Sequence, residues 1–137
     1  MIAKSAMDAS WTEGIEMDGG SVLVVVEGLS MYLSGADMVT MLQIIDKGFS
    51  NVTVFMEYMS PFVVRHVKEK SIEGSNAKFT WGCKSGKELA GLNTNFVLKE
   101  DISLIEGMKA MYPIYKFVQW IPFIKNFSNR IAVLEKY

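Results

Sequence analysis

The run Val22–Val26 contains five apolar residues and leads directly into Glu27 and Gly28. An unbroken run of this length, rich in β-branched residues, is typical of a strand that is buried on both faces, as in a parallel sheet covered by helices. Glu27 would then lie at the carboxyl end of the strand, the edge where open α/β sheets bind ligands. Glu27 is therefore either an acceptor for a ligand's hydroxyl or ammonium group or an ordinary acid at the start of a loop.

The next segment predicts a strand-helix-strand unit. Ser34 is a good N-cap with Asp37 three residues later, apolar residues follow at helical spacing, and Gly48 ends the helix. A second apolar run, Val52–Met56, leads into another acid, Glu57. A strand, a helix and a strand within so short a segment predict two parallel strands joined by a crossover helix.

The remainder of the chain continues this alternation, and we predict one α/β domain without an internal boundary. The further predicted elements are a helix from Pro61 to about Lys70, a loop over 79–86, a helical turn at Lys87–Ala90, a strand at Phe96–Leu98, a helix through Ile102, Ile105 and Met108, and a strand at Arg130–Glu135.

Composition excludes several classes of function. The 137 residues are 50% hydrophobic with a formal charge of −1, and Lys and Arg are scattered, so we expect no nucleic-acid partner. The apolar stretch Met111–Ile124 is too short and too interrupted to span a membrane. A lone cysteine, Cys83, and no signal-like start predict a cytoplasmic protein. No phosphate-binding glycine loop, metal-ligand cluster or nucleophile elbow occurs in the sequence.

The sequence does not decide the roles of two isolated reactive residues, His66 and Cys83. His66 has no Ser, Cys or Asp partner at motif spacing, so it is either a surface residue of its helix or an acid-base residue. Cys83 precedes Lys84, which favours a lowered thiol pKa, whereas an inert small residue is the plainer interpretation.

Three segments together resemble a known family. They are Ser10-Trp11, the strand that leads into Glu27-Gly28-Leu29 with Met31-Tyr32-Leu33 after it, and Phe79-Thr80-Trp81-Gly82. In this order they look like the leucine carboxyl methyltransferase family, and most of all its bacterial branch of O-methyltransferases of the tetracenomycin-polyketide-synthesis type. The resemblance spans nearly the whole chain.

The resemblance implies the carboxyl-terminal half of a class I S-adenosylmethionine-dependent methyltransferase fold, with strands four to seven in a mostly parallel sheet that has an antiparallel last strand. Residues 1–137 would form a single partial domain lacking the amino-terminal half, which supplies the glycine loop and the ribose-binding acid. The implied strand order is four, five, seven, six. Ile131–Leu134 should then insert antiparallel between Val52–Met56 and Phe96–Leu98.

The resemblance also implies site residues. Glu27 matches the acid that faces the methionine part of the cofactor, in agreement with its predicted place at the end of a strand. Ala6 and Met7 match the segment beside the adenine and Asp8 adjoins it, although the family often has an Asp-Leu pair there. For the acceptor pocket we expect Trp81, Phe79, Lys84 and Tyr32, with Trp81 as a core residue the equal alternative.

The resulting hypothesis is an O-methyltransferase that uses S-adenosylmethionine and a small-molecule acceptor, a carboxyl or hydroxyl group of a polyketide-like compound. A carboxylate acceptor needs no general base, whereas a phenol would need one, for which His66, Tyr58 and Tyr32 are weak candidates. The isolated chain should bind the cofactor weakly or not at all. The alternative hypothesis is a non-catalytic α/β fragment that acts through self-association or a partner. In either case we expect a homo-oligomer or association with the missing half.

Overall fold

A computed structural model describes residues 1–15, 19–66, 77–104, 106 and 129–137. Within these residues the chain forms a small α/β domain with a mixed four-stranded sheet. The strands are β1 (Val22–Val26), β2 (Val52–Tyr58), β3 (Val97–Ser103) and β4 (Arg130–Lys136). The helices are α1 (Gly35–Gly48), α2 (Pro61–His66) and α3 (Gly86–Ala90), with 3-10 turns η1 (Ala9–Gly14) and η2 (Ser30–Tyr32).

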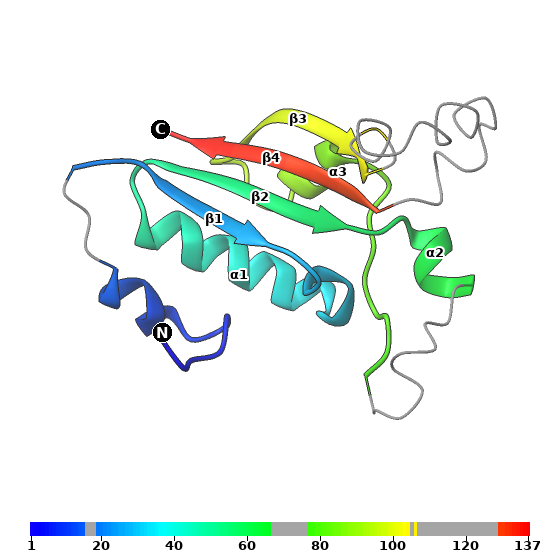
Figure 1. The fold of residues 1–137 in the computed structure, drawn as a ribbon, viewed down its shortest axis with the longest axis horizontal. Helices are drawn as coiled ribbons and strands as arrows, with labels where there is room; N and C mark the ends of the chain where they lie inside the picture. Colours follow the sequence, from blue (N-terminus) through cyan, green and yellow to red (C-terminus); the bar gives the residue numbers. More distant parts are fainter. Residues whose placement is uncertain (16–18, 67–76, 105, 107–128) are drawn as a thin grey trace.

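The strands are arranged in the order β1-β2-β4-β3 (Figure 1). β1 and β2 are parallel, and Val22 is paired with Val52. β4 is antiparallel to both β2 and β3, so the other three strands all run in one direction. The predicted crossover unit is confirmed, and so is the predicted insertion of the last strand between the strands at 52–56 and 96–98.

Helix α1 begins where the capping pattern predicts. The Ser34 hydroxyl accepts a hydrogen bond from the amide of Asp37 at 3.1 Å, and the Asp37 carboxylate accepts one from the amide of Ser34 at 3.1 Å. This reciprocal capping box satisfies two amides that a helix leaves unpaired at its start. At the other end, the Lys136 ammonium donates to the carbonyl of Phe49 at 3.1 Å and pairs with the Asp46 carboxylate at 2.7 Å, which ties β4 to the end of α1.

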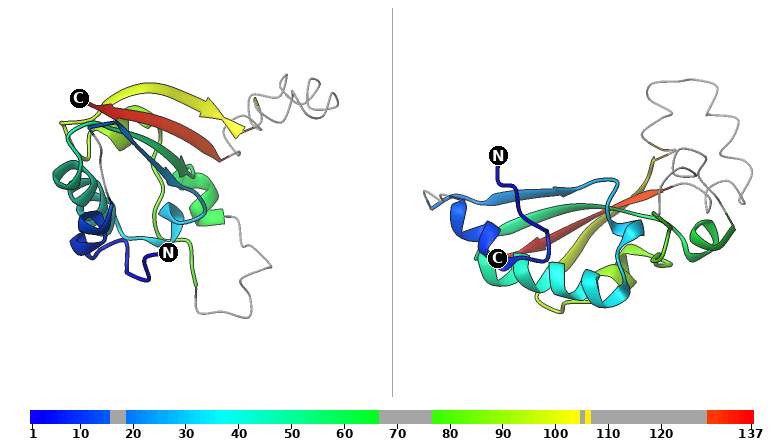
Figure 2. Two further views of the ribbon diagram at one scale, coloured as in Figure 1. Left: turned by 60° about the vertical axis from the view of Figure 1, so that its left-hand side comes forward. Right: turned by 90° about the horizontal axis from the view of Figure 1, so that it is seen from below.

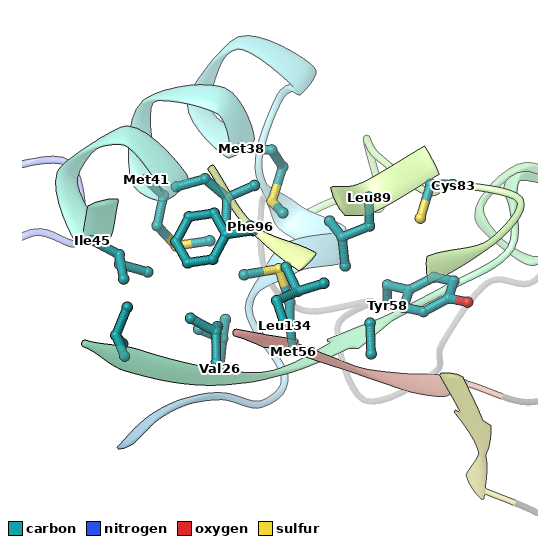
Figure 3. Close-up of a cluster of buried hydrophobic side chains, with 14 of the residues drawn as sticks. Val26, Met38, Met41, Ile45, Met56, Tyr58, Cys83, Leu89, Phe96 and Leu134 are labelled. Carbon is teal, nitrogen blue, oxygen red and sulfur yellow. The ribbon is translucent and has the colours of Figure 1, made fainter. Parts of the chain in front are cut away.

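The core lies between the sheet and the helices α1 and α3, which cover the same face (Figures 2 and 3). Alternate residues of the strands point to this face, as the two-residue period of a strand requires. Val54, Met56 and Leu134 are fully buried there against Met38 and Leu42 of α1. A buried cluster of this size is enough to fix the register of the sheet, because a slip by one residue would expose the whole row.

The opposite face of the sheet, which we call the open face, exposes several apolar side chains. Leu23 and Val25 are 61% and 62% exposed, Val97 is 56% exposed and Phe55 is 38% exposed. The expectation that Val22–Val26 is buried on both faces is therefore wrong for the described part of the chain. The physical reason is that α1 and α3 both pack on the face that carries Val54 and Met56.

Element bounds differ from the prediction in three places. Glu57 lies within β2 and not after it. Phe96 precedes β3 and is buried in the core, and Ile102 belongs to β3, where it pairs with Ile131, and not to a helix. The predicted continuation of α2 to Lys70 and the helix residues Ile105 and Met108 lie outside the described residues.

Candidate functional site

The carboxyl ends of β1 and β2 meet at a turn that is held by Glu57. Gly28 has a φ of +65°, a left-handed conformation that glycine adopts readily. The Glu57 carboxylate accepts a hydrogen bond from the Gly28 amide at 2.8 Å and another from the side-chain amide of Asn129. The Ser30 hydroxyl donates to the carbonyl of Glu57 at 2.6 Å. The loop that begins with Glu27 is thus fastened to the end of β2.

Two hollows adjoin Glu27, one on each side of β1. The edge hollow, of about 210 Å³, runs along Val24–Val26 and is closed by Ala6, Trp11 and Leu29, with Met41 and Ile45 of α1 below. The face hollow, also of about 210 Å³, lies on the open face and is lined by Leu23, Val25, Phe55, Leu104 and Ile131, with Glu27 and Glu57 at its polar end. Glu27 is exposed and shared by both, so its carboxylate can reach a ligand from either side.

The amino-terminal segment brings only part of the predicted adenine site to this edge. The indole nitrogen of Trp11 donates to the carbonyl of Ala6 at 3.3 Å, and the Trp11 ring packs at 5.8 Å from that of Phe49. Ala6 consequently lines the edge hollow together with Glu27.

Met7 and Asp8 have other surroundings. Met7 lines a separate groove with Thr12 and Lys47. The Asp8 carboxylate caps η1 by accepting hydrogen bonds from the amide and the hydroxyl of Ser10, at 3.0 and 2.6 Å, which lower the pKa of Asp8. The structure therefore joins Glu27 with Ala6, whereas Met7 and Asp8 do not line the edge hollow.

Two of the three sequence segments that carry the family resemblance, the one after β1 and the one at 79–82, lie beside each other. The amides of Thr80 and Trp81 both donate to the carbonyl of Met31, at 2.8 and 3.3 Å. The rings of Tyr32 and Phe79 are 5.4 Å apart in a tilted arrangement. The loop after β1 and the loop at 79–82 thus form one unit, and Tyr32 with Phe79 is an aromatic pair on it.

Trp81 and Lys84 have different neighbours from the Tyr32–Phe79 pair. Trp81 is partly buried against the main core and lies close to the start of α1, where an added Cβ at Gly35 would be 3.6 Å from its ring. Lys84 has an exposed side chain, and its backbone amide donates to the carboxylate of Glu88 at 2.9 Å. Trp81 thus combines a role in packing with partial exposure.

The two isolated reactive residues differ in accessibility. His66 is exposed on α2, where its ring stacks at 4.2 Å on that of Phe62 and Nδ1 lies 2.9 Å from the Phe62 carbonyl. Burial, with the charge of Glu88 adding to it, raises the pKa of the Cys83 thiol to about 12. Cys83 is 1% exposed, which supports the inert interpretation.

Tyr58 belongs to a polar network that the sequence did not reveal. Its hydroxyl donates to the Asp101 carboxylate at 2.7 Å, and burial together with this contact raises the pKa of Tyr58. The same carboxylate accepts from Nε of Arg130 at 2.8 Å and from the amide of Gly86 at 2.9 Å. The network links β2, β3, β4 and the start of α3. The strand predicted at Phe96–Leu98 ends before Asp101, so the sequence patterns contain no signal for this network.

Comparisons with protein-family models, with curated proteins and with solved structures found no match. In the described part of the chain, no helix combines the length and the apolar character needed to cross a membrane. The findings thus establish a small α/β domain with a mixed four-stranded sheet, whose β1 edge carries an exposed acid between two hollows.

Proposed function

We propose that this chain is part of an S-adenosylmethionine-dependent O-methyltransferase and that the carboxyl end of β1 contributes to the cofactor site. The observation that carries the proposal is the strand order β1-β2-β4-β3 with β4 antiparallel. This is the order expected for strands four, five, seven and six of the fold that the sequence resembles. Glu27 follows the strand that would be the fourth, at the edge where such sheets bind ligands.

The residues at this edge fit a part of the cofactor. A volume of about 210 Å³ is below the roughly 300–1,000 Å³ of sites that enclose a complete small ligand, so the edge hollow suits one portion of it. The exposed Glu27 carboxylate can accept a charge-assisted hydrogen bond from an ammonium group. Ala6, Leu29 and Trp11 offer apolar walls beside it. The remaining contacts would come from strands outside these residues.

The surroundings favour an acceptor that is already ionised. S-Adenosylmethionine supplies a methyl group on a sulfonium, and the displacement requires alignment of the nucleophile more than proton transfer. Tyr58, one of the three candidate bases, is fully buried with its hydroxyl bonded to Asp101 and is unsuited to deprotonate a ligand. We therefore propose a carboxylate acceptor, bound near the Tyr32 and Phe79 rings; Trp81 and Lys84, which have other surroundings, are not assigned to this acceptor site.

The test is Glu27→Gln in a longer protein that contains this chain together with the first three strands of such a fold. Loss of a charge-assisted hydrogen bond should weaken S-adenosylmethionine binding by about 1–3 kcal/mol. Glu100→Gln is the matched control, because Glu100 is an exposed acid on β3 at the other edge of the sheet. Equal affinities for the two variants would show that Glu27 does not contact the cofactor, and this result would contradict the proposal.

A non-catalytic domain that acts by association is the second candidate, and the open face favours it. Leu23, Val25, Phe55 and Val97 together expose an apolar surface of the kind that soluble proteins tend to cover. Transfer of a labelled methyl group to carboxylic acids by the longer protein separates the two candidates. Activity supports the enzyme, whereas its absence in a protein that binds its partner supports the association domain.

A further inference from the structure

The two edges of the sheet differ in how they are protected. β3, at one edge, carries Lys99, Glu100 and Asp101 in succession and has a bulge between Leu98 and Glu100. Charges and bulges are the usual means by which edge strands are kept from pairing with other chains. β1, at the other edge, has the sequence Val-Leu-Val-Val-Val, without a charge or a proline, and pairs regularly with β2 over all five residues. In the described part of the chain, β1 is thus the edge strand without these protections.

The hydrogen-bonding groups on the open edge can be assigned from the pairing of β1 with β2. The amide of Val22 donates to the carbonyl of Asn51 at 3.0 Å, so Val22 directs its backbone groups toward β2. Since these directions alternate along a strand, Val24 and Val26 also point toward β2. The amides and carbonyls of Leu23 and Val25 therefore point away from the sheet.

The amino-terminal segment does not use these groups. Within residues 1–15, the backbone hydrogen bonds from the amides of Asp8, Trp11 and Ile15 all go to carbonyls three residues earlier. In the portion that the structure describes, β2 is the strand with which β1 pairs. Figure 2 shows η1 beside α1, and its right-hand view shows the first residues crossing the line of β1; Figure 1 shows that they do so below the sheet and not within its plane.

We propose that the open edge of β1 pairs with β1 of a second copy of this chain, antiparallel across a two-fold axis at Val24. Leu23 of each copy then faces Val25 of the other, and these residues exchange backbone hydrogen bonds because both direct their groups outward. The pairing joins two four-stranded sheets into one of eight strands. This inference concerns the 137-residue chain by itself and needs no methyltransferase activity; in the longer protein of the proposed function, the first strand of that fold would occupy the same edge.

The edge is complementary to itself in this register. The side chains of Leu23 and Val25 are both exposed on the open face, so the pairing brings two apolar pairs into contact. Glu27 lies opposite Ser21 of the other copy, and a hydroxyl can donate to a carboxylate, so no like charges face each other. Gly20 lies opposite Gly28, where neither copy has a side chain to obstruct the approach. This absence of conflict favours a second copy as the occupant of the edge.

The first experiment measures the oligomeric state of the 137-residue chain by sedimentation velocity over a range of concentrations. We expect a reversible dimer. Leu23→Lys and Val25→Glu should each weaken the dimer about tenfold, because each replaces two apolar pairs per dimer. The double variant Leu23→Lys/Val25→Glu should regain affinity to within about threefold, since each lysine then faces a glutamate. Val97→Lys is the matched control, at an equally exposed apolar residue of β3, and should have no effect.

A second experiment detects the register by cross-linking. Val24→Cys places the two thiols opposite each other at the two-fold axis, in a non-hydrogen-bonded pair with Cα atoms about 4.5 Å apart, which a disulfide can bridge. We expect a covalent dimer under mild oxidation. Val97→Cys should give none, and the buried Cys83 should not compete.

Three results would overturn the inference. They are a chain that is folded by circular dichroism but monomeric at every concentration, a double variant as weak as the single ones, and a dimer that Val97→Lys weakens as much as Leu23→Lys. The last result would indicate packing through the open face in place of pairing through the edge.

Discussion

The carboxylate of Glu57 accepts a hydrogen bond at 2.8 Å from the backbone amide of Gly28, so the end of β2 holds the turn that follows β1. We predict that Glu57→Ala lowers the free energy of unfolding by about 1–2 kcal/mol, because it removes hydrogen bonds from Gly28 and Asn129 to one carboxylate. Urea denaturation followed by circular dichroism measures the change. Glu100→Ala, at an exposed acid of β3, should change it by less than about 0.5 kcal/mol. Equal losses would mean that the Glu57 contacts do not stabilise the turn.

Gly28→Ala tests the conformation of the same turn. A side chain at a φ of +65° should cost about 1–2 kcal/mol of stability, although nothing lies within 4 Å of the added Cβ. Gly20→Ala is the matched control, because Gly20 has equally open surroundings without a positive φ. The same denaturation experiment should show a loss for the first variant alone. A neutral Gly28→Ala would contradict the left-handed turn.

Asp101 should make stability depend on pH. Burial by itself would raise the pKa of Asp101, but hydrogen bonds from Gly86, Tyr58 and Arg130 hold it below its ordinary value of 3.8. A carboxyl whose pKa is lower in the folded protein stabilises the fold above the unfolded pKa, and this contribution is lost as the pH falls through the folded pKa.

The difference in unfolding free energy between the unsubstituted chain and Asp101→Asn should therefore be largest near neutral pH and shrink below about pH 4. Denaturation series at several pH values, with the variant as the reference, isolate the titration of Asp101 from that of the other acids. A difference that stays constant with pH would show that Asp101 titrates alike in the folded and unfolded chains.

Cys83 should be unreactive in the folded protein. The side chain is 1% exposed, and burial raises the pKa of its thiol to about 12, so very little thiolate is present at pH 8. We predict slow reaction with a disulfide reagent in buffer and complete reaction in urea, measured by the absorbance of the released thiolate. Rapid modification of the folded chain would contradict the buried position.

Local signals predicted much of the fold. The structure has β1, α1 and β2 at the predicted places, which are the run Val22–Val26, the helix capped by Ser34 and Asp37, and the run Val52–Met56. These predictions succeeded because each depends only on a few neighbouring residues. The insertion of the strand at 131–134 came from the family resemblance combined with its alternating pattern. That prediction is confirmed by the pairing of β4 with β2 and β3.

Long-range relationships were harder to predict. Ile102 was assigned to a helix because its spacing to later apolar residues is helical, whereas its pairing with Ile131 depends on a distant strand. The contact of Asp101 with Tyr58 and Arg130 likewise requires three strands in register. At the candidate site, the place of Glu27 at the sheet edge could be predicted because the residue comes directly after a strand. The hydrogen bond from Gly28 to Glu57 could not, because it depends on the direction of the Glu57 side chain, which the sequence does not specify.

The most direct test of the central claim, that the β1 edge binds part of S-adenosylmethionine, is a backbone-amide NMR titration of this chain with S-adenosylhomocysteine. We predict weak binding, because the edge hollow provides only part of a site, with shifts centred on Ala6, Trp11, Glu27 and Leu29. Glu27→Gln should reduce these shifts, whereas Glu100→Gln should leave them unchanged. Shifts centred elsewhere, or binding of this chain in the low micromolar range, would contradict the account.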